Sequence, residues 1–235
     1  MELFWTGLIE RITATQPVPE PVPVAVLGLI ALGLVVWAWP LTRIVVTIAH
    51  ESGHALMALG TGRRLTGIRL HGDSSGLTFS RGRPRGPGFV LTAFAGYPTP
   101  AVLGLGAALL LARGHAVLLL WLLVAVLAGM LLMIRNLYGL LVLALGLGGL
   151  AAASWYLPPL QQSWLAYLVT WFLLLAAPRP VWELARRPSA RSDAGQLAAA
   201  TRVPRGVWTL SFAVCTLACL AAGVTVLAPG VLRFD

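Results

Sequence analysis

The chain alternates between long apolar runs and short polar segments rich in arginine, glycine and proline. Most apolar runs come close to the roughly 20 residues that an α-helix needs to cross the hydrocarbon core of a bilayer. Proline, glycine or arginine stands near their ends, where helices begin and stop. We therefore expect an all-α polytopic membrane protein with about six or seven transmembrane helices. The expected spans are residues 22–39, 42–60, 88–112, 115–133, 136–154, 163–177 and 207–227.

One of these runs, 88–112, contains the stretch Gly96-Tyr97-Pro98-Thr99-Pro100. Proline removes a backbone donor and clashes with the preceding turn, so this span should be kinked or broken. Such breaks are tolerated in membranes where protein or a water-filled cavity covers the freed backbone groups.

Two polar segments, 62–87 and 178–205, hold most of the arginines. In the first, residues 65–70 and 76–80 flank a turn-rich stretch at 71–75, which predicts a short β-hairpin at the membrane surface. Four apolar runs separate the two segments, so both should lie on one side of the membrane. The positive-inside rule assigns that side to the cytoplasm.

The remaining segments complete the expected organisation. Residues 1–21 are interpreted as an N-terminal segment along the membrane interface, because residues 3–13 show apolar positions at helical spacing. Residues 22–229 are expected to form a single membrane-embedded domain, and residues 230–235 a C-terminal tail.

Composition supports a membrane protein and excludes other classes. Hydrophobic residues make up 58% of the chain and charged residues 11%, and the mean hydropathy is +0.83, whereas a soluble domain carries about 25% charged residues. The net charge of +9 comes from arginine alone. These arginines lie in loops beside apolar runs and form no basic face with interleaved aromatics, which argues against nucleic-acid binding. Cys215 and Cys219 are interpreted as buried small side chains.

The candidate chemistry is the stretch His50-Glu51-Ser52-Gly53-His54 inside the 42–60 run. Positions i and i+4 share one face of a helix, so both imidazoles can bind one metal ion. Glu51 can reach a water on that ion and act as a general base. Charged and polar groups are costly within a bilayer, so this turn is a functional candidate.

A catalytic zinc ion usually takes three protein ligands and leaves a fourth position for water. The best candidate for the third ligand is Asp193, in the 178–205 segment; the alternative interpretation of Asp193 is an N-cap for the helix that follows. Glu183 and Asp73 are the alternative ligands, and His71 is interpreted as a turn residue.

The motif and its surroundings resemble the site-2-protease family of intramembrane zinc metallopeptidases, in its compact bacterial branch without a peptide-binding domain. The resemblance extends over about residues 42–210. It rests on four stretches: His50-Glu51-Ser52-Gly53-His54-Ala55-Leu56, Ala95-Gly96-Tyr97, Arg135-Asn136-Leu137-Tyr138-Gly139 and Ser192-Asp193-Ala194.

This resemblance implies one Zn²⁺ per chain, held by His50, His54 and an aspartate from a later helix, here Asp193. It also implies that Asn136 holds substrate or an oxyanion. The chain departs from the family in one respect, because the aspartate signature that usually accompanies that asparagine is absent and no aspartate lies between Asp73 and Asp193.

The resulting hypothesis is an intramembrane zinc metalloprotease in the bacterial cell membrane, with its site near the cytoplasmic side. Its expected partners are the lipid bilayer and a membrane-protein or peptide substrate. The alternatives are a non-proteolytic zinc-binding membrane protein, such as a pseudoprotease or regulator, and a small transporter. Glu51 beside both histidines favours the protease, since a structural zinc site needs no base.

Overall fold

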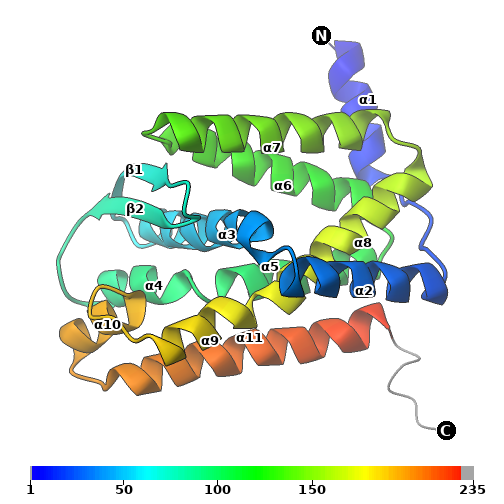
Figure 1. Ribbon diagram of the computed structural model, residues 1–235. Coiled ribbons are helices and arrows are strands. Elements are labelled where there is room, and N and C mark those ends of the chain that lie inside the picture. The colour runs from blue at the N-terminus through cyan, green and yellow to red at the C-terminus, as the bar shows by residue number, and fades with distance from the viewer. Residues whose placement is uncertain (1, 229–235) are drawn as a thin grey trace, which may run out of the picture.

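The protein is a bundle of helices with one two-stranded sheet (Figure 1). The structure, a computed structural model, describes residues 2–228, and side chains from Thr6 onward. The expected tail at 230–235 lies outside the described residues. The elements in chain order are α1 (Glu2–Thr13), α2 (Pro21–Val36), α3 (Trp39–Gly60), β1 (Arg64–Leu70), β2 (Gly76–Arg81), α4 (Pro87–Ala95), α5 (Thr99–Leu111), α6 (Ala116–Met133), α7 (Leu137–Tyr156), α8 (Pro159–Ala176), α9 (Pro178–Arg186), α10 (Asp193–Thr201) and α11 (Arg205–Leu227).

The all-α polytopic class is confirmed. By length and composition, four helical segments of the described chain can cross a membrane: α6, α7, α8 together with α9, and α11. Two further pairs, α2–α3 and α4–α5, pass only as bent pairs, which raises the number to as many as six. Six or seven membrane spans were expected, and six is the most that the described helices allow.

The expected separate spans at 22–39 and 42–60 are corrected by this geometry. α2 and α3 are bent by 101° across a short break and qualify as a membrane span only together. Pro40 lies in the first turn of α3, where its missing N–H costs nothing and its ring prevents α2 from continuing into α3. The predicted break in the 88–112 run is confirmed, because α4 and α5 meet at 69°.

The run predicted at 163–177 begins earlier than expected. α7 continues to Tyr156 and α8 starts at Pro159, so only two residues connect them. Two polar side chains at the facing ends of these helices are buried and bonded: Ser154 donates to the carbonyl of Leu150, and Gln162 donates to the carbonyl of Ser154. These local bonds let helix replace the uncharged loop that the sequence indicated.

The predicted hairpin is present. β1 pairs with β2 in antiparallel register, with Ile68 opposite Thr78 and Leu70 opposite Gly76. Ile68 and Leu70 are fully buried in a cluster that includes Ala55 of α3. This packing fixes the hairpin against the helix that carries the two histidines.

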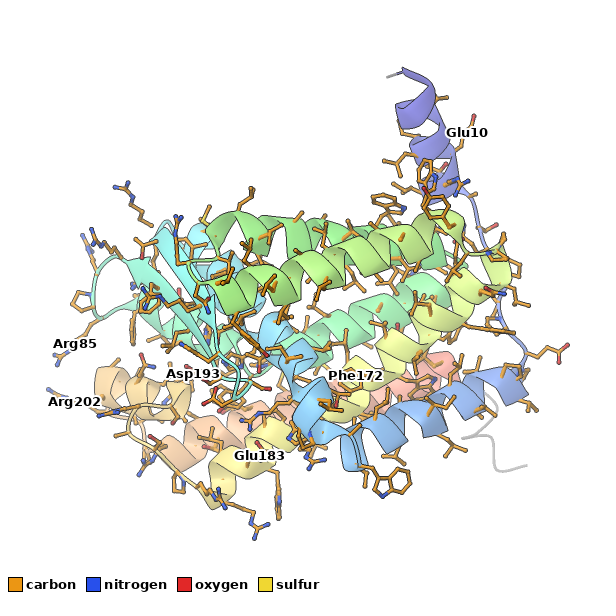
Figure 2. The ribbon with its side chains drawn as sticks, turned by 45° about the horizontal axis from the view of Figure 1, so that its top comes forward. Glu10, Arg85, Phe172, Glu183, Asp193 and Arg202 are labelled. Carbon is orange, nitrogen blue, oxygen red and sulfur yellow. The ribbon has the colours of Figure 1, made fainter. Side chains whose placement is uncertain are left out.

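Both arginine-rich segments lie at one end of the bundle. Figure 2 places Arg85 and Arg202 together at that end and Glu10 at the other. The 178–205 segment contains α9 and α10 rather than loop alone. The shared end agrees with the expectation that both segments face one side of the membrane; that this side is the cytoplasm stays a prediction.

Candidate metal centre

Helix α3 carries His50, Glu51 and His54 within one turn, close to the α4–α5 break. Gly53 makes this approach possible, because a Cβ on it would lie 2.7 Å from Cβ of Thr99, much closer than any real contact. The glycine inside the motif thus lets α3 lie directly on the broken span.

Gly96, in the break between α4 and α5, lies next to both imidazole rings. A Cβ on Gly96 would lie 2.6 Å from Nε2 of His50 and would also overlap Nε2 of His54. Gly96 therefore leaves empty the space in front of both imidazole nitrogens. The next residue, Tyr97, meets the His50 ring edge-on at 4.9 Å between centroids and stacks on Phe212 at 4.8 Å, which supports the His50 ring from one side.

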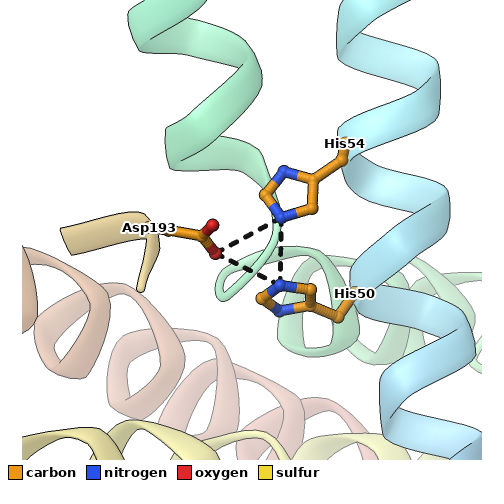
Figure 3. A group of neighbouring side chains, drawn as sticks. All are labelled: His50, His54 and Asp193. Carbon is orange, nitrogen blue, oxygen red and sulfur yellow. Dashed lines mark hydrogen bonds and ion pairs between the residues drawn. The ribbon is translucent and has the colours of Figure 1, made fainter. Parts of the chain in front are cut away.

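Helix α10 brings the carboxylate of Asp193 to these histidines (Figure 3). Oδ2 of Asp193 lies 3.2 Å from Nε2 of His50 and 3.3 Å from Nε2 of His54. The N-cap of α10 is Ser192, whose hydroxyl accepts a hydrogen bond from the N–H of Gly195. Because Ser192 fills the capping position, the carboxylate of Asp193 is left to face the two rings.

The His54 ring is oriented by a backbone group of α4. Its Nδ1 lies 2.7 Å from the carbonyl oxygen of Thr92, and a carbonyl can only accept, so Nδ1 carries the proton. In the neutral ring that a metal ion requires, Nε2 is therefore the nitrogen that is free to bind the ion. A histidine that ligates a metal is typically oriented in this way.

These three residues fit a zinc ion. The two Nε2 atoms are 3.0 Å apart, and ligands at about 2.0–2.1 Å from a tetrahedral ion lie roughly 3.3 Å from one another. They form the only group of three or more metal-ligating side chains found among the described residues. Burial alone would raise the pKa of the Asp193 carboxyl, but the charge that His54 carries when protonated, together with hydrogen bonds from both rings, holds that pKa below its ordinary value.

Glu51 is buried, and its carboxylate is held by the hairpin. The hydroxyl of Thr78 on β2 donates to Oε2 of Glu51 at 2.6 Å. Glu51, the two histidines and Asp193 all line one cavity of about 770 Å³, together with every residue of β2. A carboxylate with a fixed orientation therefore shares a cavity with the candidate metal ligands.

The alternative third ligands lie elsewhere. Glu183 accepts from Nε1 of Trp39 at 2.9 Å and pairs with Arg43 at 3.4 Å. Asp73 occupies the hairpin turn, where hydrogen bonds from Ser75 hold the pKa of its carboxyl below the ordinary value. His71, beside it, contacts the Ser75 hydroxyl, as a turn residue would.

Asn136 is not among the residues that line the cavity. Its Nδ2 donates to the carbonyl of Leu70 at 2.6 Å, and its Oδ1 accepts from the N–H of Leu70 at 3.2 Å. In this structure the side chain therefore ties the α6–α7 connection to the outer edge of β1. The role in holding substrate that the resemblance implied for Asn136 stays a prediction.

Sequence reasoning missed two groups that orient the site, Thr78 and the carbonyl of Thr92. The sequence predicted a strand at 76–80, which includes Thr78, but no pattern in the sequence shows that this residue meets Glu51. The carbonyl of Thr92 leaves no side-chain signal at all. Gly96 did stand out, as part of the break, although its proximity to the histidines is visible only in the fold.

The comparison with protein families gives one result. A sequence model of the family described as Peptidase M50B-like matches residues 23–223, a region that includes every residue of the cluster. No curated protein and no solved structure matches the chain.

Proposed function

Because the chain belongs to the Peptidase M50B-like family, the site-2-protease family, we propose that it is an intramembrane zinc metalloendopeptidase. Its substrates would be peptide bonds of membrane proteins. The observation that carries the proposal is the cluster of His50, His54 and Asp193 with Glu51 in the same cavity. A zinc site that only stabilised the fold would more often be closed by a fourth protein ligand and would need no adjacent carboxylate.

His50, His54 and Asp193 would hold one Zn²⁺ per chain. When bound, the ion supplies Lewis acidity, which polarises the carbonyl of a peptide bond and makes a coordinated water more acidic. The cluster would contribute three protein ligands, which would leave room for water or substrate, as in catalytic zinc sites.

Glu51 would act as the general base. Its carboxylate takes the proton of the attacking water and delivers it to the leaving amine as the peptide bond breaks. The hydrogen bond from Thr78 to Oε2 fixes the orientation of this carboxylate, while Oε1 remains available for the proton. Gly76 gives Oε1 its space, since a Cβ there would lie 2.6 Å away.

Hydrolysis also requires water, and the cavity supplies a route for it. The same cavity that holds the cluster is lined by exposed residues of the hairpin, including Arg69 and Arg81. The polar end of the bundle is thereby connected to a catalytic centre placed between apolar helices.

Purified protein with Glu51→Gln tests the proposal. An unselected library of synthetic peptides in detergent micelles is incubated with zinc-loaded protein, and cleavage is read by mass spectrometry. We expect wild type and the matched control Glu183→Gln to cut the library, and Glu51→Gln to lose at least about 100-fold in rate while keeping its zinc. Cleavage by Glu51→Gln at the wild-type rate would refute the mechanism, and bound zinc without any cleavage by wild type would favour a non-proteolytic zinc protein.

A further inference from the structure

Five arginines are among the residues that line the cavity with the catalytic cluster. They come from three separate parts of the chain: the two arginine-rich segments and the connection between α6 and α7. The arginines that line the cavity are Arg63, Arg69, Arg81, Arg135 and Arg191.

Carboxylates do not balance this charge. The acidic residues in the cavity lining are Glu51 and Asp193, which the proposed function already assigns to proton transfer and to the metal. Elsewhere in the described part of the chain, the arginines in ion pairs are Arg43 and Arg179, and both pair with Glu183.

The cavity arginines instead contact neutral groups or none. Arg63 donates to the Ser80 hydroxyl, and Arg135 donates weakly to the carbonyl of Thr66. The side chains of Arg81 and Arg191 are exposed and have no hydrogen-bond or ion-pair partner among the residues that the structure describes. Such guanidinium groups keep their full capacity to bind a carboxylate.

A pair of like charges in the hairpin is a second observation that favours a bound anion near the cavity. Arg64 and Arg81 are direct cross-strand partners, and like charges in that relation destabilise a sheet unless something neutralises them. The exposed face of β2 also carries Leu77 and Phe79, with the guanidinium of Arg69 located 5.8 Å from the Phe79 ring centroid. Apolar and cationic side chains thus lie close together on this exposed face of the hairpin.

We propose that the site selects peptide segments with Asp or Glu side chains close to the bond to be cut. The inference rests on the proposed function and adds the chemistry of its substrate. Anionic lipid is the competing occupant. The arginines in question share a cavity with the catalytic cluster, where the cleaved chain must lie, whereas others such as Arg85 and Arg202 lie outside that cavity and can serve the headgroups.

Binding to the Glu51→Gln variant tests the inference without requiring cleavage. The probes are two short fluorescein-labelled peptides of equal length, one alternating Leu with Asp and the other alternating Leu with Asn, measured by anisotropy in neutral detergent. We expect the Asp peptide to bind at least about 5-fold more tightly, with the difference shrinking as salt rises. Equal binding of the two peptides, or no binding of either, overturns the inference.

Charge reversal of single arginines tests which of them cause the preference for the Asp peptide. In the Glu51→Gln background, Arg81→Glu and Arg191→Glu should each reduce the preference for the Asp peptide by about 3-fold or more, while the matched control Arg85→Glu leaves it unchanged. If the cavity variants keep the peptide preference and instead lose binding to anionic vesicles, the arginines serve lipid and the inference is wrong. If the wild-type protein cleaves no peptide, the proposed hydrolase activity fails, but the binding result still stands. The failure of one proposal can therefore be distinguished from the failure of the other.

Discussion

Asp193 and Glu183 are carboxylates of the same arginine-rich segment, ten positions apart, yet their surroundings differ in kind. Glu183, on α9, has its oxygens occupied by Trp39, Arg43 and Arg179. Asp193, at the start of α10, faces two imidazoles. Their side chains also differ in exposure, at 35% for Glu183 and 15% for Asp193.

The difference teaches that the partners of a carboxylate, rather than its type or its place in the chain, decide whether it can bind a metal. Glu183 is neutralised by permanent cations and joins α9 to α3. Asp193 meets rings that can be neutral and can share a divalent ion with it. A structural ion pair and a candidate ligand therefore arise from one segment through different neighbours.

The most direct test of this comparison is to remove the charge of each carboxylate in turn. We expect Asp193→Asn to lower zinc affinity by more than about 100-fold, since even residues that only orient ligands cost 10–100-fold. Glu183→Gln should keep one zinc per chain. Metal content of the purified proteins, with zinc titration under a competing chelator, measures both. Equal zinc content in the two variants would contradict the assignment of Asp193.

A substitution that adds volume without removing a ligand has the next largest effect. Gly96→Ala places a methyl group in the space before both Nε2 atoms, so we expect a loss of zinc that approaches that of Asp193→Asn. The control is Gly106→Ala on α5, where a Cβ meets nothing within 4 Å. Wild-type zinc affinity in Gly96→Ala would show that the rings can move aside.

Thr78→Val separates orientation of the base from binding of the metal. It removes the hydroxyl that bonds Glu51 but keeps a β-branched residue in the strand. We expect peptide cleavage to fall roughly 10- to 100-fold at unchanged zinc content. Thr66→Val is the control, because that hydroxyl bonds the Phe79 carbonyl within the same hairpin. A parallel loss of zinc would indicate damage to the fold instead.

The smallest effect concerns the cap that frees Asp193. Ser192→Ala should destabilise the start of α10 by about 1 kcal/mol, which corresponds to about a 5-fold weaker zinc affinity if α10 must be ordered to bind. Ser211→Ala, whose hydroxyl bonds its own helix, serves as the control. An unchanged affinity in Ser192→Ala would mean that packing alone holds α10 in place.

Much of the fold followed from the sequence because membrane helices and turns have local signals. The hairpin at 64–81 and the break at Gly96 and Pro98 were predicted from turn residues and proline. The bend between α2 and α3 was not. Pro40 marked a helix end, but the angle between the two helices depends on contacts with residues far along the chain, such as the hydrogen bond from Arg179 to the carbonyl of Val35.

The site residues also divide into those with a local sequence signal and those brought together only by the fold. His50, Glu51 and His54 could be found because one helical turn brings them together. Asp193 needed elimination and a family resemblance, since no local pattern connects residues of α3 and α10. The role of Asn136 rests on the resemblance alone and stays a prediction; in the structure its side chain contacts the backbone of Leu70. Thr78 could not be identified in advance, because its role depends on how the hairpin lies against α3.

The candidate site takes one part each from α3, the α4–α5 break and α10, which are joined by long stretches of chain. No short fragment can therefore reproduce it, and zinc retention becomes a reporter of assembly. If the ion binds only where all three parts meet, its release during denaturation in detergent should coincide with the separation of α10 from α3 rather than with the melting of individual helices. Bound metal would then report tertiary packing separately from helix content, since membrane helices satisfy their backbone hydrogen bonds internally and can persist after the packing is lost.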